Sequence, residues 1–187
     1  MAKAGIGNPI TVFHARWLAA ALATAVAFAA QTSLFGNISL WGIRPDLVLV
    51  VVVAYGLHYG PAPGAVLGLV AGFFVDVYGG RLIGMGGLAK LTAGAVAGLI
   101  GETVFRERAL VWAAVTGAGS IVANGVYLLL ARAFGLEIPV GLSISRVIAP
   151  SALCDTAAGF FLYPLLAHLF ELSDQRDERR RLGRAED

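Results

Sequence analysis

Apolar residues occur along this chain in six long runs, separated by short breaks that are polar or rich in glycine and proline. A helix needs about 20 apolar residues to cross the roughly 30 Å hydrocarbon core of a bilayer. All but the second run contain at least 18 residues. The pattern therefore predicts an all-α membrane protein, a bundle of six transmembrane helices at residues 17–35, 46–59, 62–79, 84–101, 109–131 and 147–170.

The second run is the shortest of the six. As a helix its 14 residues would span only about 21 Å, and its valine-rich part, residues 47–53, would favour a buried strand in a soluble protein. A lone strand in a bilayer leaves its backbone groups without hydrogen bonds, so a helix is predicted instead. Glycine and proline at 60–64 predict a tight turn into the third helix.

The composition agrees with a membrane protein. Hydrophobic residues make up 58% of the 187 positions, charged residues make up 14%, and there are 24 glycines. A soluble domain of this length exposes too much of its surface to carry so many apolar side chains. The single cysteine, Cys154, excludes an intramolecular disulfide.

The distribution of charge predicts the orientation, because Lys and Arg favour the cytoplasmic side of a membrane. With both termini in the cytoplasm, nine of these residues lie on the inner side and four on the outer side. We interpret residues 1–170 as one membrane domain and 171–187, which holds eleven charged residues, as a charged cytoplasmic tail that does not bind nucleic acid. The first run also resembles a signal peptide with a cleavage motif at 27–29, and we expect it to be retained as a helix.

Small residues recur at helical spacing on the third and fourth predicted helices. Glycine stripes allow two helix backbones to approach closely. The stripes either pack the bundle internally or receive the transmembrane helix of a partner, and spacing alone does not separate these two roles. The candidate docking residues are Gly64, Gly68 and Gly72 on the third helix, and Gly94, Gly98 and Gly101 on the fourth.

Three ionisable residues lie within the predicted spans, where they are costly and need partners. Asp76 and Lys90 lie in the outer halves of neighbouring helices, so we expect them to form an ion pair. Asp155 falls near mid-depth, as does Asn124 on the preceding helix. With Thr116, Ser120 and Tyr127 they could line a polar cavity, although structural hydrogen bonds within the bundle are the commoner outcome.

No catalytic or metal-binding pattern is found in the sequence. The three histidines, at positions 14, 58 and 168, have no ligand spacing between them, and no phosphate-binding glycine loop or serine nucleophile motif occurs. We predict no enzyme activity, no cofactor and no metal.

One ordered set of motifs resembles the rod shape-determining protein MreD family. It begins with Arg44-Pro45-Asp46 at the start of the second helix and continues with a Gly-x-x-x-Gly-x-x-x-Asp run from Gly68 to Asp76. A glycine-rich turn leading to a Gly-x-x-x-Leu-Ala stretch follows at 79–89, and Lys90 comes directly after it. The last helix contains Tyr163-Pro164-Leu165-Leu166, which is similar to the end of the family's last helix.

This resemblance implies a non-enzymatic component of the machinery that elongates rod-shaped bacteria, located in the inner (cytoplasmic) membrane. Family members are thought to bind MreC, a protein with one transmembrane segment, in an assembly with MreB, RodA and a penicillin-binding transpeptidase. The family also resembles, in fold, the S-components of energy-coupling-factor transporters. A scaffold for a partner helix is therefore our first hypothesis, and a vitamin-binding transporter subunit that uses Asn124, Tyr127 and Asp155 is the alternative.

Overall fold

The computed structural model describes residues 9–33, 45–80, 84–104, 108–136, 141 and 144–183, with side chains from 16 to 176 within these ranges. Its helices are α1 (Pro9–Ser33), α2 (Leu47–Tyr59), α3 (Pro61–Gly79), α4 (Met85–Gly101), α5 (Ala109–Ala133) and α7 (Ala149–Gly183). A short π-helical turn, η1 (Ile144–Ile148), precedes α7. Six helices and no strand among these residues confirm the predicted fold class.

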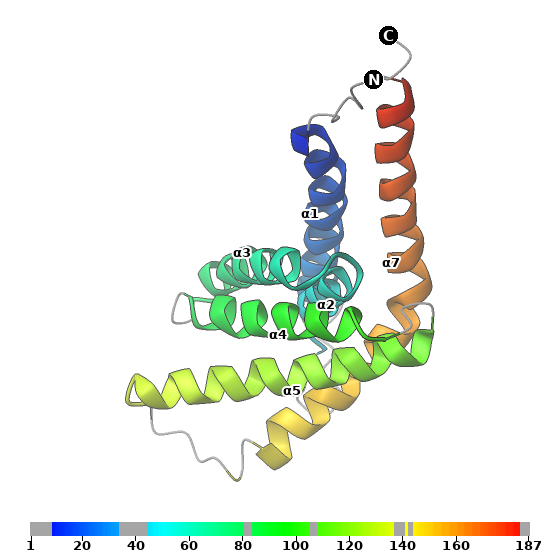
Figure 1. The fold of residues 1–187 in the computed structure, drawn as a ribbon. Coiled ribbons are helices and arrows are strands. Elements are labelled where there is room, and N and C mark those ends of the chain that lie inside the picture. Colours follow the sequence, from blue (N-terminus) through cyan, green and yellow to red (C-terminus); the bar gives the residue numbers. More distant parts are fainter. Residues whose placement is uncertain are drawn as a thin grey trace.

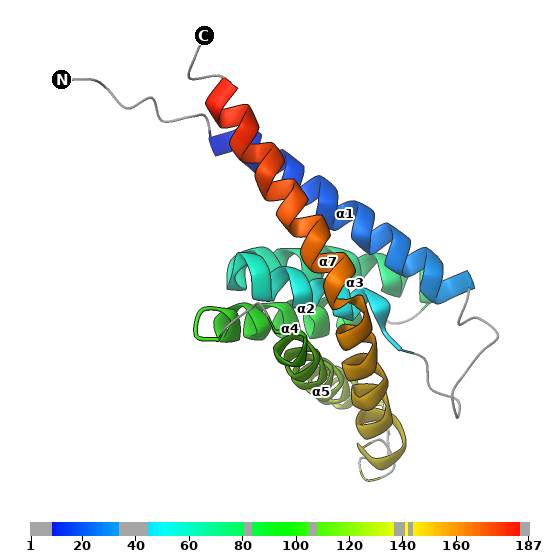
Figure 2. The same cartoon turned by 90° about the vertical axis from the view of Figure 1, so that its right-hand side faces the viewer.

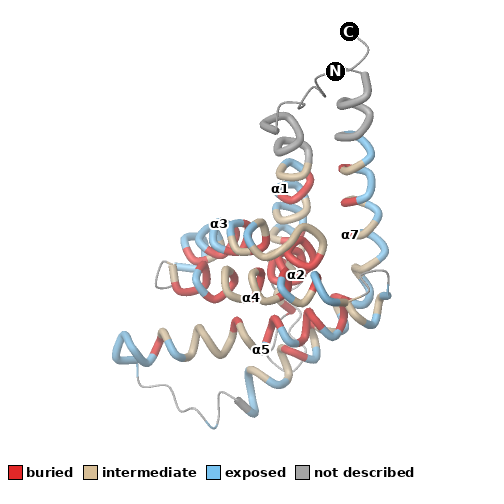
Figure 3. Tube along the Cα trace, viewed as in Figure 1, coloured by how far each residue is buried: buried red, intermediate tan, exposed pale blue. Residues whose placement is uncertain are grey.

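The helix α2 lies at the centre of the molecule and contacts α1, α3, α4, α5 and α7. Every residue from Val48 to Leu57 is buried, and Figure 3 shows this as a nearly continuous buried segment. A helix that is apolar on all sides belongs inside a protein. The valine-rich run is therefore a core helix enclosed by its neighbours, which explains why 13 residues suffice.

The helices α3, α4 and α5 lie one below another in Figure 1, and α1 and the C-terminal half of α7 run across them. The start of α1 and the end of α7 lie at the same end of the molecule in both Figure 1 and Figure 2. Among the described residues, three segments are long and apolar enough to cross a membrane, namely Pro61–Gly79, Ala109–Ala133 and Ser145–Arg176. The helices α2 and α4 are shorter apolar helices.

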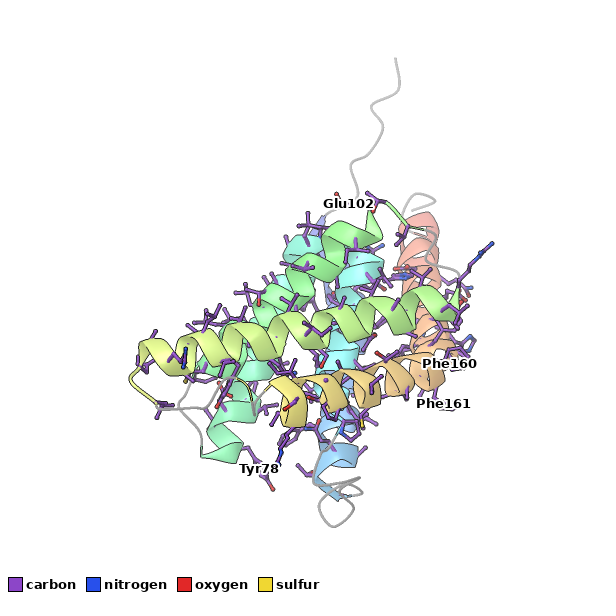
Figure 4. All side chains as sticks on the ribbon, turned by 90° about the horizontal axis from the view of Figure 1, so that it is seen from below. Tyr78, Glu102, Phe160 and Phe161 are labelled. Carbon is purple, nitrogen blue, oxygen red and sulfur yellow. The ribbon has the colours of Figure 1, made fainter. Side chains whose placement is uncertain are left out.

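The first and last helices of the chain extend beyond their predicted bounds. The helix α1 begins at Pro9 rather than at residue 17, and α7 continues from the predicted end at 170 to Gly183. Polar residues continue a helix as readily as apolar ones, so hydropathy marks only its apolar part. The α7 helix also contains Pro164. Two of its aromatic side chains, Phe160 and Phe161, are exposed on the surface (Figure 4).

Candidate functional site

A network of charged and polar side chains lies inside the bundle at the start of α2. The Asp46 side chain caps α2 by accepting a hydrogen bond from the Leu49 N–H at 3.0 Å. Its second oxygen, Oδ2, lies 2.5 Å from the Lys90 Nζ on α4. The lysine side chain is only 9% exposed. The carboxylate of Asp46 therefore compensates for the free energy that it costs to bury the charged ammonium group.

Asp155 on α7 extends the network to two further elements. It accepts one hydrogen bond from the Asp46 N–H at 2.7 Å and another from the Ser120 hydroxyl of α5 at 2.6 Å. The Asn124 amide donates in turn to the Ser120 carbonyl at 2.9 Å and to its hydroxyl at 3.3 Å. The network therefore connects α2, α4, α5 and α7 through polar groups that bind one another.

The expected cavity-lining set is thus only partly brought together. Asn124 and Asp155 belong to one hydrogen-bonded chain, as the structural alternative anticipated, whereas Tyr127 packs against the apolar core. Ser120, which completes the chain, lies one turn before Asn124, and that i, i+4 spacing is the signal in the sequence that links the two.

Asp76 has a different partner from the one expected. Its Oδ2 accepts hydrogen bonds from the N–H groups of Gly84, Gly86 and Gly87, at 3.0, 2.8 and 3.3 Å. These are the unpaired donors at the N-terminus of α4, where a negative charge is also favoured by the helix dipole. The predicted Asp76–Lys90 ion pair is therefore wrong, because Asp76 caps α4 and Lys90 pairs with Asp46.

This cap makes a measurable prediction. Asp76→Ala should lower the free energy of unfolding by about 3 kcal/mol, since three N–H groups, two of them buried, lose their acceptor. Asp76→Asn keeps one acceptor oxygen and should cost less. Thermal unfolding in mild detergent measures both. Glu102→Ala, at the exposed opposite end of α4 (Figure 4), is the control and should change stability by less than about 0.5 kcal/mol. Equal effects at the two ends would contradict the capping role.

The glycine stripes pack α3 against α4. A Cβ atom at Gly72 would lie 2.6 Å from the Gly86 carbonyl oxygen, and one at Gly64 would lie 2.5 Å from the Gly94 oxygen. Gly68 faces the backbone of Lys90, and Gly98 faces Gly60 and Pro61. Gly101 faces the backbone of Leu57 on α2. The stripes therefore pack the bundle internally, which was the first of the two roles considered. The hypothesis that these glycines receive a partner helix is wrong for this structure, because backbone of the bundle's own helices already lies against them.

A second polar cluster, which sequence reasoning missed, lies where α1, α2 and α7 meet. Asp174 pairs with the Arg16 Nε at 3.0 Å and with the His58 Nε2 at 3.2 Å. The Tyr59 hydroxyl contacts Ser173 at 2.9 Å and Asp174 at 3.3 Å, and the Arg16 guanidinium lies over the Tyr59 ring. Asp174 belongs to the predicted tail, so the first residues of that segment are part of the folded bundle.

An open apolar groove of about 790 Å³ lies between α1 and α3, and Val48 of α2 also lines it. The helix α1 packs on α2 and α7 and touches α3 only slightly. At one end the rings of Phe28 and Tyr78 meet edge to face with centroids 5.0 Å apart. The groove is lined by Trp17, Ala21, Thr24, Ala25 and Phe28 of α1, Val48 of α2, and Val66, Leu67, Val70, Ala71, Phe74, Val75, Val77 and Tyr78 of α3.

Comparison with known families identifies the chain. The family model described as rod shape-determining protein MreD matches residues 11–173. The chain belongs to the MreD family. No curated protein and no solved structure matches it. Membership shows a membrane protein with a role in determining rod shape, and it confirms the resemblance that the motifs between residues 44 and 90 indicated.

Several residues of the MreD motifs have structural roles in the bundle. Asp46 caps α2 and holds Lys90, Asp76 caps α4, and Pro45 is buried at the start of α2. Arg44 lies outside the described residues. Within that described part of the chain, no three His, Cys, Asp or Glu residues are grouped so that they could hold a metal ion.

Proposed function

We propose that this MreD-family protein is a non-enzymatic scaffold of the bacterial cell-elongation machinery. It binds the transmembrane segment of MreC in the cytoplasmic membrane, with both of its own termini in the cytoplasm, and so positions the peptidoglycan synthases. RodA, the penicillin-binding transpeptidase and MreB join the assembly indirectly. The observation that carries the proposal is the family match over residues 11–173, in a chain whose described residues are 91% helical and form no strand.

The packing of the bundle supports a positional role. The helices α3 and α4 meet along glycines at backbone contact, and α2 is enclosed by five neighbours. Interiors packed in this way deform little and transmit position from one side to another. A rigid body of this kind fixes where a bound helix stands in the membrane plane, and the domain attached to that helix is fixed with it.

The polar groups also favour a scaffold over the alternative of a vitamin-binding subunit. Asn124 and Asp155 bond to Ser120 and to the Asp46 backbone rather than facing the groove. The groove itself has an apolar lining. Binding between such a surface and a partner rests on van der Waals packing and a few hydrogen bonds between helices, each worth about 0.5–2 kcal/mol.

Co-purification tests the proposal. The full chain is expressed with the MreC of the same organism, extracted in mild detergent and captured by a tag on the MreD-family chain. We expect MreC to be retained in a fixed ratio, and an unrelated membrane protein with a single transmembrane segment, expressed at the same level, to be washed away. A chain that retains neither MreC nor any synthase, but carries a vitamin-sized molecule detectable by mass spectrometry, would overturn the scaffold in favour of the transporter subunit.

A further inference from the structure

The C-terminal part of α7 is held against the bundle by the side that carries Asp174. This carboxylate pairs with Arg16 of α1 at 3.0 Å and with His58 of α2 at 3.2 Å. Phe170, one turn earlier on the same side of the helix, is completely buried. These contacts fix the rotation of α7 about its own axis. The opposite side of this part of α7 is therefore turned away from α1 and α2.

That opposite side changes from leucine to arginine within one helical turn. Leu165 is 64% exposed, and Leu172, which follows it by two turns, is 39% exposed. Arg176 comes four residues after Leu172 and is exposed as well. Positions three and four residues apart share one side of a helix. The next two such positions, 179 and 180, are also arginine in the sequence, and α7 continues through both of them.

The acidic residues at this end of α7 occupy other positions of the helical repeat. Three and four residues away from Arg176 the sequence holds leucine, serine and two arginines, and no carboxylate. Asp177 and Glu178 instead follow Asp174 by three and four residues, so their positions share its side of the helix. Arg181 follows Asp174 by seven residues, which is two turns. The repeat therefore separates three arginines from the acids, and one arginine shares the acidic side.

The direction of this part of α7 keeps it close to the membrane surface. The helices α3 and α5 are long and apolar enough to cross a bilayer, and the C-terminal half of α7 runs across α5 in both Figure 1 and Figure 2. The rise from Leu172 to position 180 is about 12 Å, whereas the headgroup layer of one leaflet is about 5–8 Å thick. An upright helix would leave that layer, but an oblique one keeps all three arginines within it.

Lipid phosphates and an acidic protein surface are the two partners that arginines could bind at this place. The exposed leucines on the same side favour lipid. Acyl chains can cover Leu165 and Leu172 while the phosphates of the same leaflet reach Arg176 one turn further along, and membrane-surface helices combine apolar burial with attraction to anionic lipids in this way. An acidic protein surface could pair with the arginines but has no apolar part to cover the leucines.

We propose that Arg176, Arg179 and Arg180 form a binding site for the phosphate groups of anionic phospholipids. The site anchors the end of α7 in the headgroup layer, and because α7 is joined to α1 and α2 through Asp174, it sets the depth of the bundle in the membrane. The inference rests on the proposed function only for the leaflet, which is the cytoplasmic one when both termini lie in the cytoplasm. The site itself requires neither MreC nor a synthase.

Thermal unfolding of the full chain in the presence of lipid tests the site. Protein in a neutral detergent is titrated with phosphatidylglycerol, phosphatidylcholine or inorganic phosphate at constant ionic strength. We expect phosphatidylglycerol to raise the unfolding temperature, because a ligand that binds the folded state stabilises it, and the other two to leave it nearly unchanged. Equal shifts with the two lipids would overturn the site. An equal shift with inorganic phosphate would assign the arginines to a free anion and overturn the lipid assignment.

Two arginines of the same helix provide a matched pair of variants. Arg176→Gln should weaken the binding of phosphatidylglycerol about fivefold, which corresponds to the roughly 1 kcal/mol that one arginine contributes near an anionic surface. Arg181→Gln removes the same charge from the acidic side and should stay within about twofold of wild type. Native mass spectrometry counts the lipid molecules that each variant retains, so a change in folding stability is not mistaken for loss of binding. Equal losses would show that only the net charge of the tail attracts lipid, and would overturn the site.

The same preparations separate this site from the proposed scaffold. Retention of MreC by the wild-type chain is measured beside lipid binding. A phosphatidylglycerol effect without MreC retention contradicts the scaffold alone, and MreC retention without a phosphatidylglycerol effect contradicts the lipid site alone. If Arg176→Gln releases MreC and leaves lipid binding unchanged, the arginines bind an acidic surface of that partner and the lipid site is overturned.

Discussion

Gly68→Ala is expected to lower the free energy of unfolding by about 3 kcal/mol or more, although it adds a single methyl group. The new Cβ would overlap the Lys90 carbonyl oxygen of α4 and lie 2.5 Å from its carbonyl carbon. Backbone atoms in a packed helix cannot turn aside as the end of a side chain can, so the two helices must separate. Separation would also disturb the Asp46–Lys90 pair, because Lys90 is the residue in contact.

Gly125→Ala is the matched control for this change. Gly125 also lies within a helix, α5, but a Cβ there would meet no atom within 4 Å. Alanine should therefore leave stability unchanged or raise it by up to about 1 kcal/mol, through its better helix propensity. Thermal unfolding of both variants in mild detergent measures the difference. Similar unfolding temperatures for the two variants would show that α3 and α4 are not in backbone contact at Gly68.

The sequence was sufficient for the helices because burial and bilayer length both select apolar runs. The predicted starts and ends of α2, α3, α4 and α5 differ from the observed ones by at most two residues. The larger differences are in the first and last helices, where α1 begins in a stretch of mixed polar and apolar residues and α7 continues into polar ones. Hydropathy carries no information there, because propensity and tertiary contacts such as Arg16–Asp174 decide how far a helix continues.

Partner choice among the polar residues was much less predictable. Asp76 and Lys90 are close in sequence and at similar depth, which suggested an ion pair, but the turn between α3 and α4 brings Asp76 to three free N–H groups. Lys90 instead meets Asp46, which is 44 positions away. Depth in the membrane follows from position along a helix, whereas pairing depends on the rotation of each helix about its axis, which the sequence does not give.

The glycine stripes illustrate a related ambiguity. Their spacing correctly indicates that another helix approaches closely, but the spacing is the same whether that helix belongs to this chain or to a partner. The structure assigns α4 to the stripe on α3.

A double-mutant cycle at Asp46 and Lys90 should show strong coupling. Asp46→Asn keeps a side chain that can cap α2 but removes the charge that faces Lys90. The buried ammonium is then left unpaired, and we expect the free energy of unfolding to fall by about 3–5 kcal/mol. Lys90→Met should cost less, because the Asp46 side chain is 29% exposed and keeps some contact with solvent.

The double variant Asp46→Asn with Lys90→Met removes both charges together. It should be more stable than Asp46→Asn alone, because replacing a buried pair costs much less than breaking it. The comparison cycle combines Asp76→Asn with Lys90→Met, and its effects should add to within about 0.5 kcal/mol, since those side chains share no partner. Chemical unfolding in mild detergent measures all five variants. Additive effects at Asp46 and Lys90, with coupling at Asp76 and Lys90, would mean that Lys90 pairs across the α3–α4 turn after all.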